Sequence, residues 1–133
     1  MSTPRRVLLV DDDTPLRESL KEQLDLQGEF IVADAATGAS GLEKAKTELP
    51  DLVILDVGLP YFDGLDFATT LLADATVARV PIIFISADES FADRAVRLGT
   101  DFIVKPIRKA RLLASVARAL SYKSERARAA PSH

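Results

Sequence analysis

The distribution of apolar residues constrains the fold of this 133-residue chain more than any other feature. Four of its five apolar runs are nearly continuous rather than alternating, which is typical of strands buried on both faces of a parallel sheet. Parallel strands need long crossover connections, so we expect a helix between successive runs. The runs are rich in Val, Ile, Leu and Phe and occupy residues 7–10, 30–32, 52–55, 81–85 and 102–104.

Helical patterns fill the segments between these runs. Pro15 suits the first turn of a helix that Asp13 or Thr14 caps and that Gly28 ends. Strand and helix then alternate five times, which predicts a doubly wound α/β fold with right-handed crossovers. The other predicted helices cover residues 40–49, 65–73 and 90–98, and a last one begins after Pro106.

Length and composition predict one domain. A mass of 14.4 kDa is close to the commonest domain size, and 47% hydrophobic residues are enough to build one core. Residues 122–133 contain no large aliphatic side chain, so we expect the folded domain to span residues 1–121. The last segment is then a C-terminal tail, a frayed helix end or a linker.

Several classes of function are disfavoured by the composition. A net charge of −3 and a pI near 5.2 argue against a nucleic-acid-binding surface, which is usually strongly basic. The absence of cysteine excludes disulfides and thiolate metal sites, and the one histidine is the last residue, His133. No apolar stretch approaches the ~20 residues that span a bilayer. We therefore expect a cytoplasmic protein that binds neither membrane nor nucleic acid.

Acidic residues directly follow two of the apolar runs. Asp11 and Asp12 come after residues 7–10, and Asp56 comes after residues 52–55. In doubly wound folds, ligands bind beyond the carboxyl ends of the strands, where the strand order reverses. We expect these carboxylates to form one pocket around a hard divalent cation such as Mg²⁺, which prefers oxygen ligands.

Two further polar residues, Ser86 and Lys105, stand at the ends of the fourth and fifth runs. The set favours phosphoryl transfer, in which the protein mainly positions groups and neutralises charge. A carboxylate can attack phosphorus, and a divalent cation offsets its repulsion of the donor. Each residue also has an ordinary interpretation, as a helix cap, an exposed lysine or a surface hydroxyl. Their shared position at strand ends favours the functional one.

The motifs that carry these residues resemble a known family. In order they are Val-Asp-Asp-Asp, Leu-Asp-Val-Gly-Leu-Pro, Ile-Ser-Ala and Phe-Ile-Val-Lys-Pro, spread over residues 5–121. This pattern is similar to the receiver domain of bacterial two-component response regulators. The resemblance implies a flavodoxin-like fold, with a five-stranded parallel sheet and five helices.

The resemblance also implies a phosphoacceptor and a metal site. Asp56 would accept a phosphoryl group from a sensor histidine kinase or a histidine phosphotransfer protein. Mg²⁺ would be held by Asp56 and Asp12 directly, by Asp11 through water, and by the backbone carbonyl of Gly58.

A switch is implied at the other two strand ends. Ser86 would be the hydroxyl that turns toward the phosphoryl group, and Lys105 would form an ion pair there. Phe102, three residues before the lysine, matches the aromatic residue that moves with the hydroxyl. The altered surface would comprise the fourth helix, the fifth strand and the fifth helix, with a phosphorylation-dependent dimer as one outcome. The output would be a downstream protein target or a missing effector domain.

The main alternative is an enzyme, an Mg²⁺-dependent phosphatase with an aspartyl nucleophile. The segment from Asp11 to Thr14 faintly resembles the haloacid dehalogenase motif, but the spacing differs and the chain has no room for a cap domain. A flavin-binding module is a third possibility, and it lacks a phosphate loop after the first strand. A signalling domain that is not an enzyme is the preferred interpretation.

Overall fold

The sheet has the predicted parallel architecture. The structure is a computed structural model that describes residues 3–58, 64–74, 80–98 and 101–129. Its five described strands form one sheet in the order β2-β1-β3-β4-β5, and all neighbours are parallel. The strands are β1 (Arg5–Val10), β2 (Phe30–Ala35), β3 (Leu52–Asp56), β4 (Ile82–Ser86) and β5 (Asp101–Val104).

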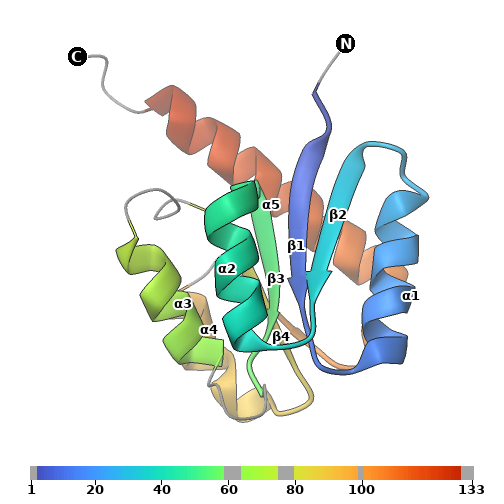
Figure 1. Ribbon diagram of the computed structural model, residues 1–133, viewed down its shortest axis with the longest axis vertical. Coiled ribbons are helices and arrows are strands. Elements are labelled where there is room, and N and C mark those ends of the chain that lie inside the picture. The colour runs from blue at the N-terminus through green and yellow to red at the C-terminus, as the bar shows by residue number, and fades with distance from the viewer. Residues whose placement is uncertain (1–2, 59–63, 75–79, 99–100, 130–133) are drawn as a thin grey trace.

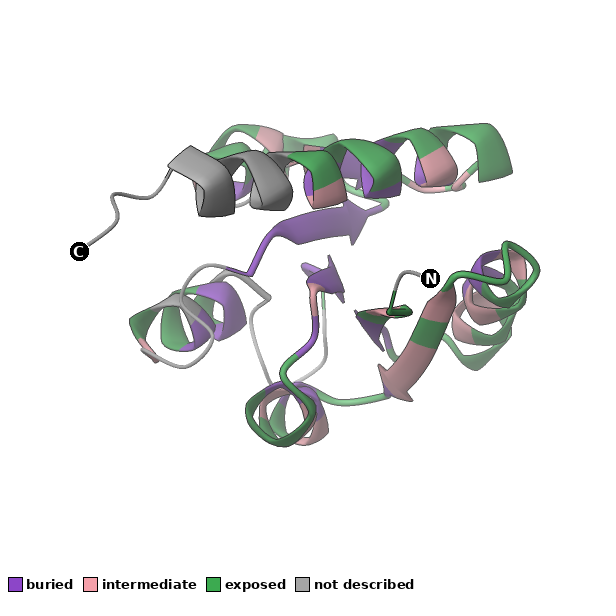
Figure 2. Ribbon diagram, turned by 90° about the horizontal axis from the view of Figure 1, so that it is seen from above, coloured by how far each residue is buried: buried purple, intermediate pink, exposed green. Residues whose placement is uncertain are grey.

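Helices cover both faces of this sheet (Figures 1 and 2). The arrangement confirms the flavodoxin-like fold of five parallel strands and five helices. The helices are α1 (Thr14–Asp25), α2 (Gly38–Glu48), α3 (Gly64–Ala73), α4 (Ala92–Leu98) and α5 (Lys109–Ala129), with a 3₁₀ turn, η1 (Glu89–Phe91), before α4.

Two hydrophobic cores lie on opposite faces of the sheet, and β3 contributes to both. Leu52 and Ile54 pack in the core that α1 and α5 cover, whereas Val53 and Leu55 pack in the core that α2, α3 and α4 cover. All residues of β3 are buried, as are those of β4. Burial on both faces explains why these apolar runs are continuous.

The first helix begins as predicted and ends earlier. Asp13 is its N-cap, because its side chain accepts a hydrogen bond from the Leu16 amide at 3.1 Å, and Pro15 lies in the first turn. The helix ends at Asp25, three residues before Gly28. A turn follows, in which Gly28 adopts a left-handed φ of 75° and its amide donates to the Asp25 carbonyl.

Most other elements differ from their predicted bounds by only one or two residues, and three differ more. Strand β2 continues to Ala35 because its last residues pair with β1, which overrides their weaker apolarity. The predicted helix over residues 90–98 is divided into η1 and α4, and the Asp88 side chain caps η1 by accepting from the Ser90 amide at 2.8 Å. Helix α5 extends past residue 121, and the division into domain and tail at that position stays a prediction. His133 lies outside the described residues.

In the described part of the chain, no helix combines the length and apolarity that crossing a membrane requires.

The strand order places two carboxylates at one point of the sheet edge. From β1 the chain first moves to β2 on one side and then to β3 on the other, so the order reverses between β1 and β3. Val10 and Leu55 are partners in the β1–β3 register. The next residues along the two strands, Asp11 and Asp56, are therefore neighbours at the carboxyl edge, which is the lower edge in Figure 1.

Candidate functional site

An acidic pocket forms where β1 and β3 end. Asp11, Asp12 and Asp56 each offer a carboxylate oxygen, and these oxygens lie within 4.8 Å of one another. Asp11 is 0% exposed and Asp56 is 5% exposed, while Asp12 is exposed. The fold thus brings together the three acids expected to converge, with two of them buried and the third accessible to solvent.

Lys105 reaches into the same pocket from the end of β5. Its Nζ lies 3.1 Å from Asp11 Oδ2 and 3.1 Å from Asp56 Oδ2. Its backbone amide donates to the Ser86 carbonyl at 2.9 Å, which ties the end of β5 to the end of β4. The following Lys105–Pro106 bond is cis, a form that occurs in proteins almost only before proline.

The pocket changes the pKa values of Asp11 and Lys105. Burial raises the pKa of Asp11 and the nearby Asp56 charge raises it further, while the Asp13 amide and Lys105 oppose the shift. Partial burial lowers the pKa of Lys105, but Asp11 and Asp56 outweigh this effect and leave the pKa above its usual value. Lys105 is therefore a stable cation beside the acids.

These residues fit a hard divalent cation. Among the described residues, none donates a hydrogen bond to the buried Asp11 Oδ2, although the Lys105 ammonium lies at ion-pair distance. Three carboxyl groups lie beside one ammonium, so acidic groups outnumber basic ones in this pocket. Oxygen ligands and this charge suit Mg²⁺.

Gly58 lies directly beside the buried carboxylate of Asp56. Its amide donates to Asp56 Oδ1 at 2.9 Å, and a Cβ at this position would lie 3.6 Å from the same oxygen. One oxygen of Asp56 therefore contacts a backbone amide and the other contacts Lys105. The Gly58 carbonyl as a metal ligand stays a prediction.

Ser86 and Phe102 lie on adjacent strands near this edge. Ser86 ends β4, is 4% exposed, and its Oγ accepts a hydrogen bond from the Asp88 amide at 3.0 Å. Phe102 is 8% exposed on β5, where its partner in the register is Phe84. The Asp88 carboxylate accepts hydrogen bonds from Ser90, which lower the pKa of Asp88. The hydroxyl of Ser86 is thus engaged by the loop that follows it.

Two residues beside the pocket were not selected from the sequence. Arg17 on α1 donates from Nη1 to the Asp11 carbonyl at 2.8 Å and from Nε to Asp34 Oδ2 at 2.7 Å. A signal for Asp34 exists, because it follows an apolar run as Asp11 and Asp56 do. The sequence analysis misses Asp34 because it ends this strand at residue 32, whereas β2 continues to Ala35.

Sequence comparison identifies the family of this chain. The model of the family described as "Response regulator receiver domain" matches residues 7–117. The chain is 40% identical over 117 residues to the transcriptional regulatory protein PrrA of Mycobacterium tuberculosis, covering 86% of this chain and 49% of PrrA. It is 33% identical over 117 residues to the chemotaxis protein CheY of Bacillus subtilis, covering 87% of this chain and 98% of CheY. The chain thus spans about half the length of the PrrA proteins it matches.

Solved structures agree with this assignment. A CheY-like response regulator receiver domain protein from Methanospirillum hungatei superposes with a TM-score of 0.84 at 26% identity, over 93% of this chain and 99% of that one. The receiver domain of sensor histidine kinase PA1611 from Pseudomonas aeruginosa has a magnesium ion coordinated in its active-site cleft. It superposes with a TM-score of 0.80 at 26% identity, over 90% of this chain and 99% of that one. The chain belongs to the response regulator receiver domain family.

Proposed function

We propose that this receiver domain acts in two-component signalling by taking a phosphoryl group on Asp56 in an Mg²⁺-dependent reaction. The observation that supports the assignment is the meeting of buried Asp56 with Asp11, Asp12 and Lys105 at one sheet edge. Both buried acids contact a backbone amide and the lysine, and Asp56 is the one that keeps some exposure, at 5% against 0% for Asp11.

The proposed reaction transfers phosphorus from nitrogen to oxygen. A carboxylate oxygen of Asp56 attacks the phosphorus of a phosphohistidine, the new P–O bond forms as the P–N bond breaks, and the electron pair stays on the imidazole nitrogen. Lys105 is placed to neutralise an oxygen of the transferred group. The Ser86 Oγ accepts a hydrogen bond from the Asp88 amide, so its own proton is available to donate to a second phosphoryl oxygen.

The metal ligands we propose are the carboxylates of Asp12 and Asp56, the carbonyl of Gly58 and, through water, the carboxylate of Asp11. Bound Mg²⁺ would supply positive charge between the donor phosphate and the acids. Asp12 is exposed and is the acid that an arriving cation meets first, whereas Asp11 is buried and held by the Asp13 amide at 2.8 Å.

The partners of this chain are proposed from its family. Receiver domains of response regulators interact with histidine kinases and effector domains. For this chain we propose a sensor histidine kinase or a histidine phosphotransfer protein as donor, and a downstream protein target or an effector domain as output. The two kinds of relative illustrate both outputs, because PrrA is about twice as long as the matched region and CheY is matched over almost its whole length. A cytoplasmic location stays a prediction.

We propose that the output surface is the face formed by α4, β5 and α5. Val96 on α4 is 49% exposed and Val104 on β5 is 36% exposed, so apolar side chains are available there for a partner or for a second copy of the chain. Phe102 lies on β5, which belongs to this face and is followed directly by Lys105, and this position supports its proposed role in the switch.

Intact mass measurement after treatment with acetyl phosphate and Mg²⁺ tests the assignment. We expect the mass of one phosphoryl group on the wild type, none after addition of a chelator, and none on Asp56→Asn. Asp25→Asn is the matched control, because Asp25 is an exposed carboxylate at the end of α1, and it should label normally. A mass gain that persists in Asp56→Asn refutes the acceptor. Repeated turnover of a generic phosphoester would instead support the phosphatase alternative.

A further inference from the structure

We infer that Arg17 is a positioning residue for the acidic pocket, because it holds the peptide group between Asp11 and Asp12 in the orientation that aims both carboxylates at one cation. This inference rests on the metal site of the proposed function. It assigns a role to a helix residue outside the set of ligands.

The first argument is the geometry of the guanidinium group. Arg17 Nη1 donates to the Asp11 carbonyl at 2.8 Å while Nε donates to Asp34 Oδ2 at 2.7 Å. The Arg17 side chain is 13% exposed and that of Asp34 is 32% exposed. A guanidinium is planar and rigid, so anchoring one nitrogen on Asp34 fixes the direction in which the other donates.

The second argument is the identity of the accepting group. The Asp11 carbonyl belongs to the planar peptide unit that joins Asp11 to Asp12. Rotation of this plane would redirect the chain at both acids. The amide of Asp11 is held by the Ala35 carbonyl at 3.1 Å, so β2 fixes Asp11 on both sides, directly at its nitrogen and through Arg17 at its oxygen.

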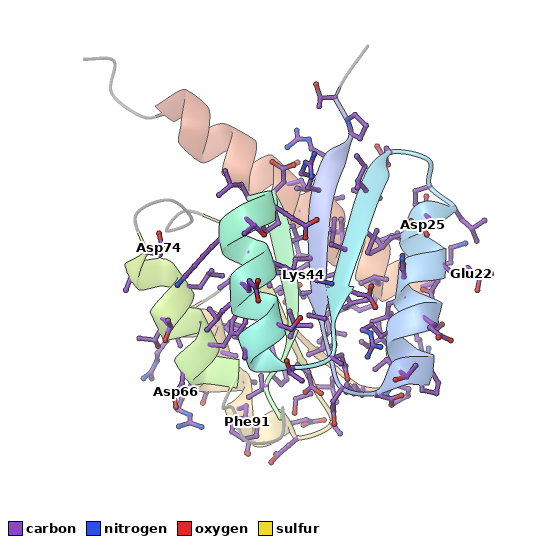
Figure 3. All side chains as sticks on the ribbon, in the orientation of Figure 1. Glu22, Asp25, Lys44, Asp66, Asp74 and Phe91 are labelled. Atoms are coloured by element: carbon purple, nitrogen blue, oxygen red, sulfur yellow. The ribbon has the colours of Figure 1, made fainter. Side chains whose placement is uncertain are left out.

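The third argument is that α1 and α2 both support this arrangement. The Arg17 amide donates to the Asp13 carbonyl at 2.9 Å, and the Asp13 amide donates to Asp11 Oδ1 at 2.8 Å. On the other side, the Lys44 side chain extends from α2 toward β2, where its Nζ donates to the Asp34 carbonyl (Figure 3). The acidic loop is therefore held by its neighbours and does not depend on its own contacts alone.

A positioning role and simple charge repulsion predict opposite changes in Mg²⁺ affinity when Arg17 is replaced. Arg17 is a cation beside a pocket that binds a cation, so repulsion alone predicts that removing it strengthens Mg²⁺ binding. A positioning role predicts the opposite, because a disordered ligand set binds a metal more weakly. Groups outside the ligand shell that orient ligands typically contribute about 10- to 100-fold to metal affinity.

Calorimetric titration of Mg²⁺ into unphosphorylated protein tests the inference with two variants. Arg17→Met removes the charge and the hydrogen bonds, and we expect affinity about 10-fold weaker than wild type. Arg17→Lys keeps the charge but lacks the planar guanidinium that donates to two groups at once. Charge repulsion therefore predicts unchanged Mg²⁺ affinity for this variant, whereas a positioning role predicts weaker Mg²⁺ binding. The lysine variant also serves if the methionine variant does not fold. Arg111→Met is the matched control, because Arg111 forms an Arg–Asp pair with Asp101 at 2.9 Å, and its affinity should equal that of the wild type.

The outcomes separate this inference from the proposed function. Wild-type or stronger Mg²⁺ binding by both folded Arg17 variants overturns the positioning role and leaves the metal site intact. Failure of the wild type to bind Mg²⁺, or undiminished binding by Asp12→Asn, overturns the metal site and the inference with it. Weaker binding by both Arg17 variants, with Arg111→Met unchanged, supports both.

Discussion

Lys105 Nζ and Asp56 Oδ2 lie 3.1 Å apart although 49 positions separate the two residues in the chain. Asp56 ends β3 and Lys105 follows β5, so β4 lies between them in the sheet. The lysine crosses the end of β4, where its amide is bound to the Ser86 carbonyl. The pocket is thus a product of strand order, and three strand ends must be correctly placed for it to form.

Replacing this lysine should strengthen metal binding. In Lys105→Met the ammonium that lies 3.1 Å from both Asp11 and Asp56 is lost, so a divalent cation no longer competes with it. We expect Mg²⁺ affinity to rise about fivefold, which corresponds to relief of about 1 kcal/mol of repulsion at high dielectric. Titration calorimetry measures the change, with the exposed Lys109→Met as control. Unchanged affinity would show that the ammonium does not oppose the metal.

Removing the Ser86 hydroxyl should separate phosphorylation from the response. We expect Ser86→Ala to take up the phosphoryl group at Asp56, because the acceptor and the acids remain. Loss of the hydrogen bond from the Asp88 amide should lower the free energy of unfolding by about 1 kcal/mol. The phosphorylation-dependent shift of the Phe102 amide in ¹H–¹⁵N spectra should disappear. Ser86→Thr keeps the hydroxyl and should keep the shift, whereas a full response in the alanine variant contradicts the switch assignment.

The glycine of α2 that faces β1 should not tolerate a side chain. A Cβ at Gly41 would lie 2.9 Å from Val10 Cγ2 and 3.0 Å from the Phe67 ring, closer than carbon atoms normally pack. We expect Gly41→Ala to lower the free energy of unfolding by about 1–3 kcal/mol through overpacking. Urea denaturation measures the loss. Gly58→Ala is the control, because its Cβ would make an ordinary 3.6 Å contact. Equal stability of the two variants would contradict the argument.

Acid should weaken an ion cluster between β5 and α5. Burial raises the pKa of Asp101, but hydrogen bonds from Arg111 and Ser115, a third from the Phe102 amide, and the Arg111 charge together lower it from 3.8 to about 2. A carboxylate with a depressed pKa stabilises the folded state above its unfolded pKa, and this stabilisation is lost as the pH falls from about 4 to about 2.

The expected size follows from that shift and can be measured in urea. Asp101→Asn should lower the free energy of unfolding by roughly 2 kcal/mol or less at pH 7. The difference from wild type should shrink as the pH falls below 4. Asp25→Asn, at the exposed end of α1, is the control and should show little effect at either pH. A difference for Asp101→Asn that stays constant down to pH 2 would show that the charge of Asp101 does not matter.

The candidate site residues share a simple local rule. Asp11, Asp56, Ser86 and Lys105 each follow an apolar run, and parallel strands bring such ends to one edge. Both the runs and their ends can be read from short segments. For that reason the sequence was enough to predict the parallel sheet, the five helices and the meeting of Asp11, Asp56 and Lys105.

The contacts that hold the pocket in place could not be predicted from the sequence in the same way. The contact of Arg17 with Asp11 and Asp34 depends on one side-chain conformation across three elements, and no spacing in the chain encodes it. The division between η1 and α4 depends on the Asp88 side chain capping a short turn within a helical pattern. The sequence therefore indicates which groups meet, while the contacts that hold them require coordinates.

Alternate side chains of β3 pack in opposite cores, and this packing keeps the strand in the register that forms the pocket. A slip of β3 by one residue would exchange Leu52 and Ile54 with Val53 and Leu55 and would also point Asp56 away from Asp11. Such a slip would ruin the packing of the protein together with its chemistry. Substitutions that impair the chemistry of a well-folded molecule should therefore arise at the polar residues that end the strands or follow them in the loops, which lie outside the two hydrophobic cores.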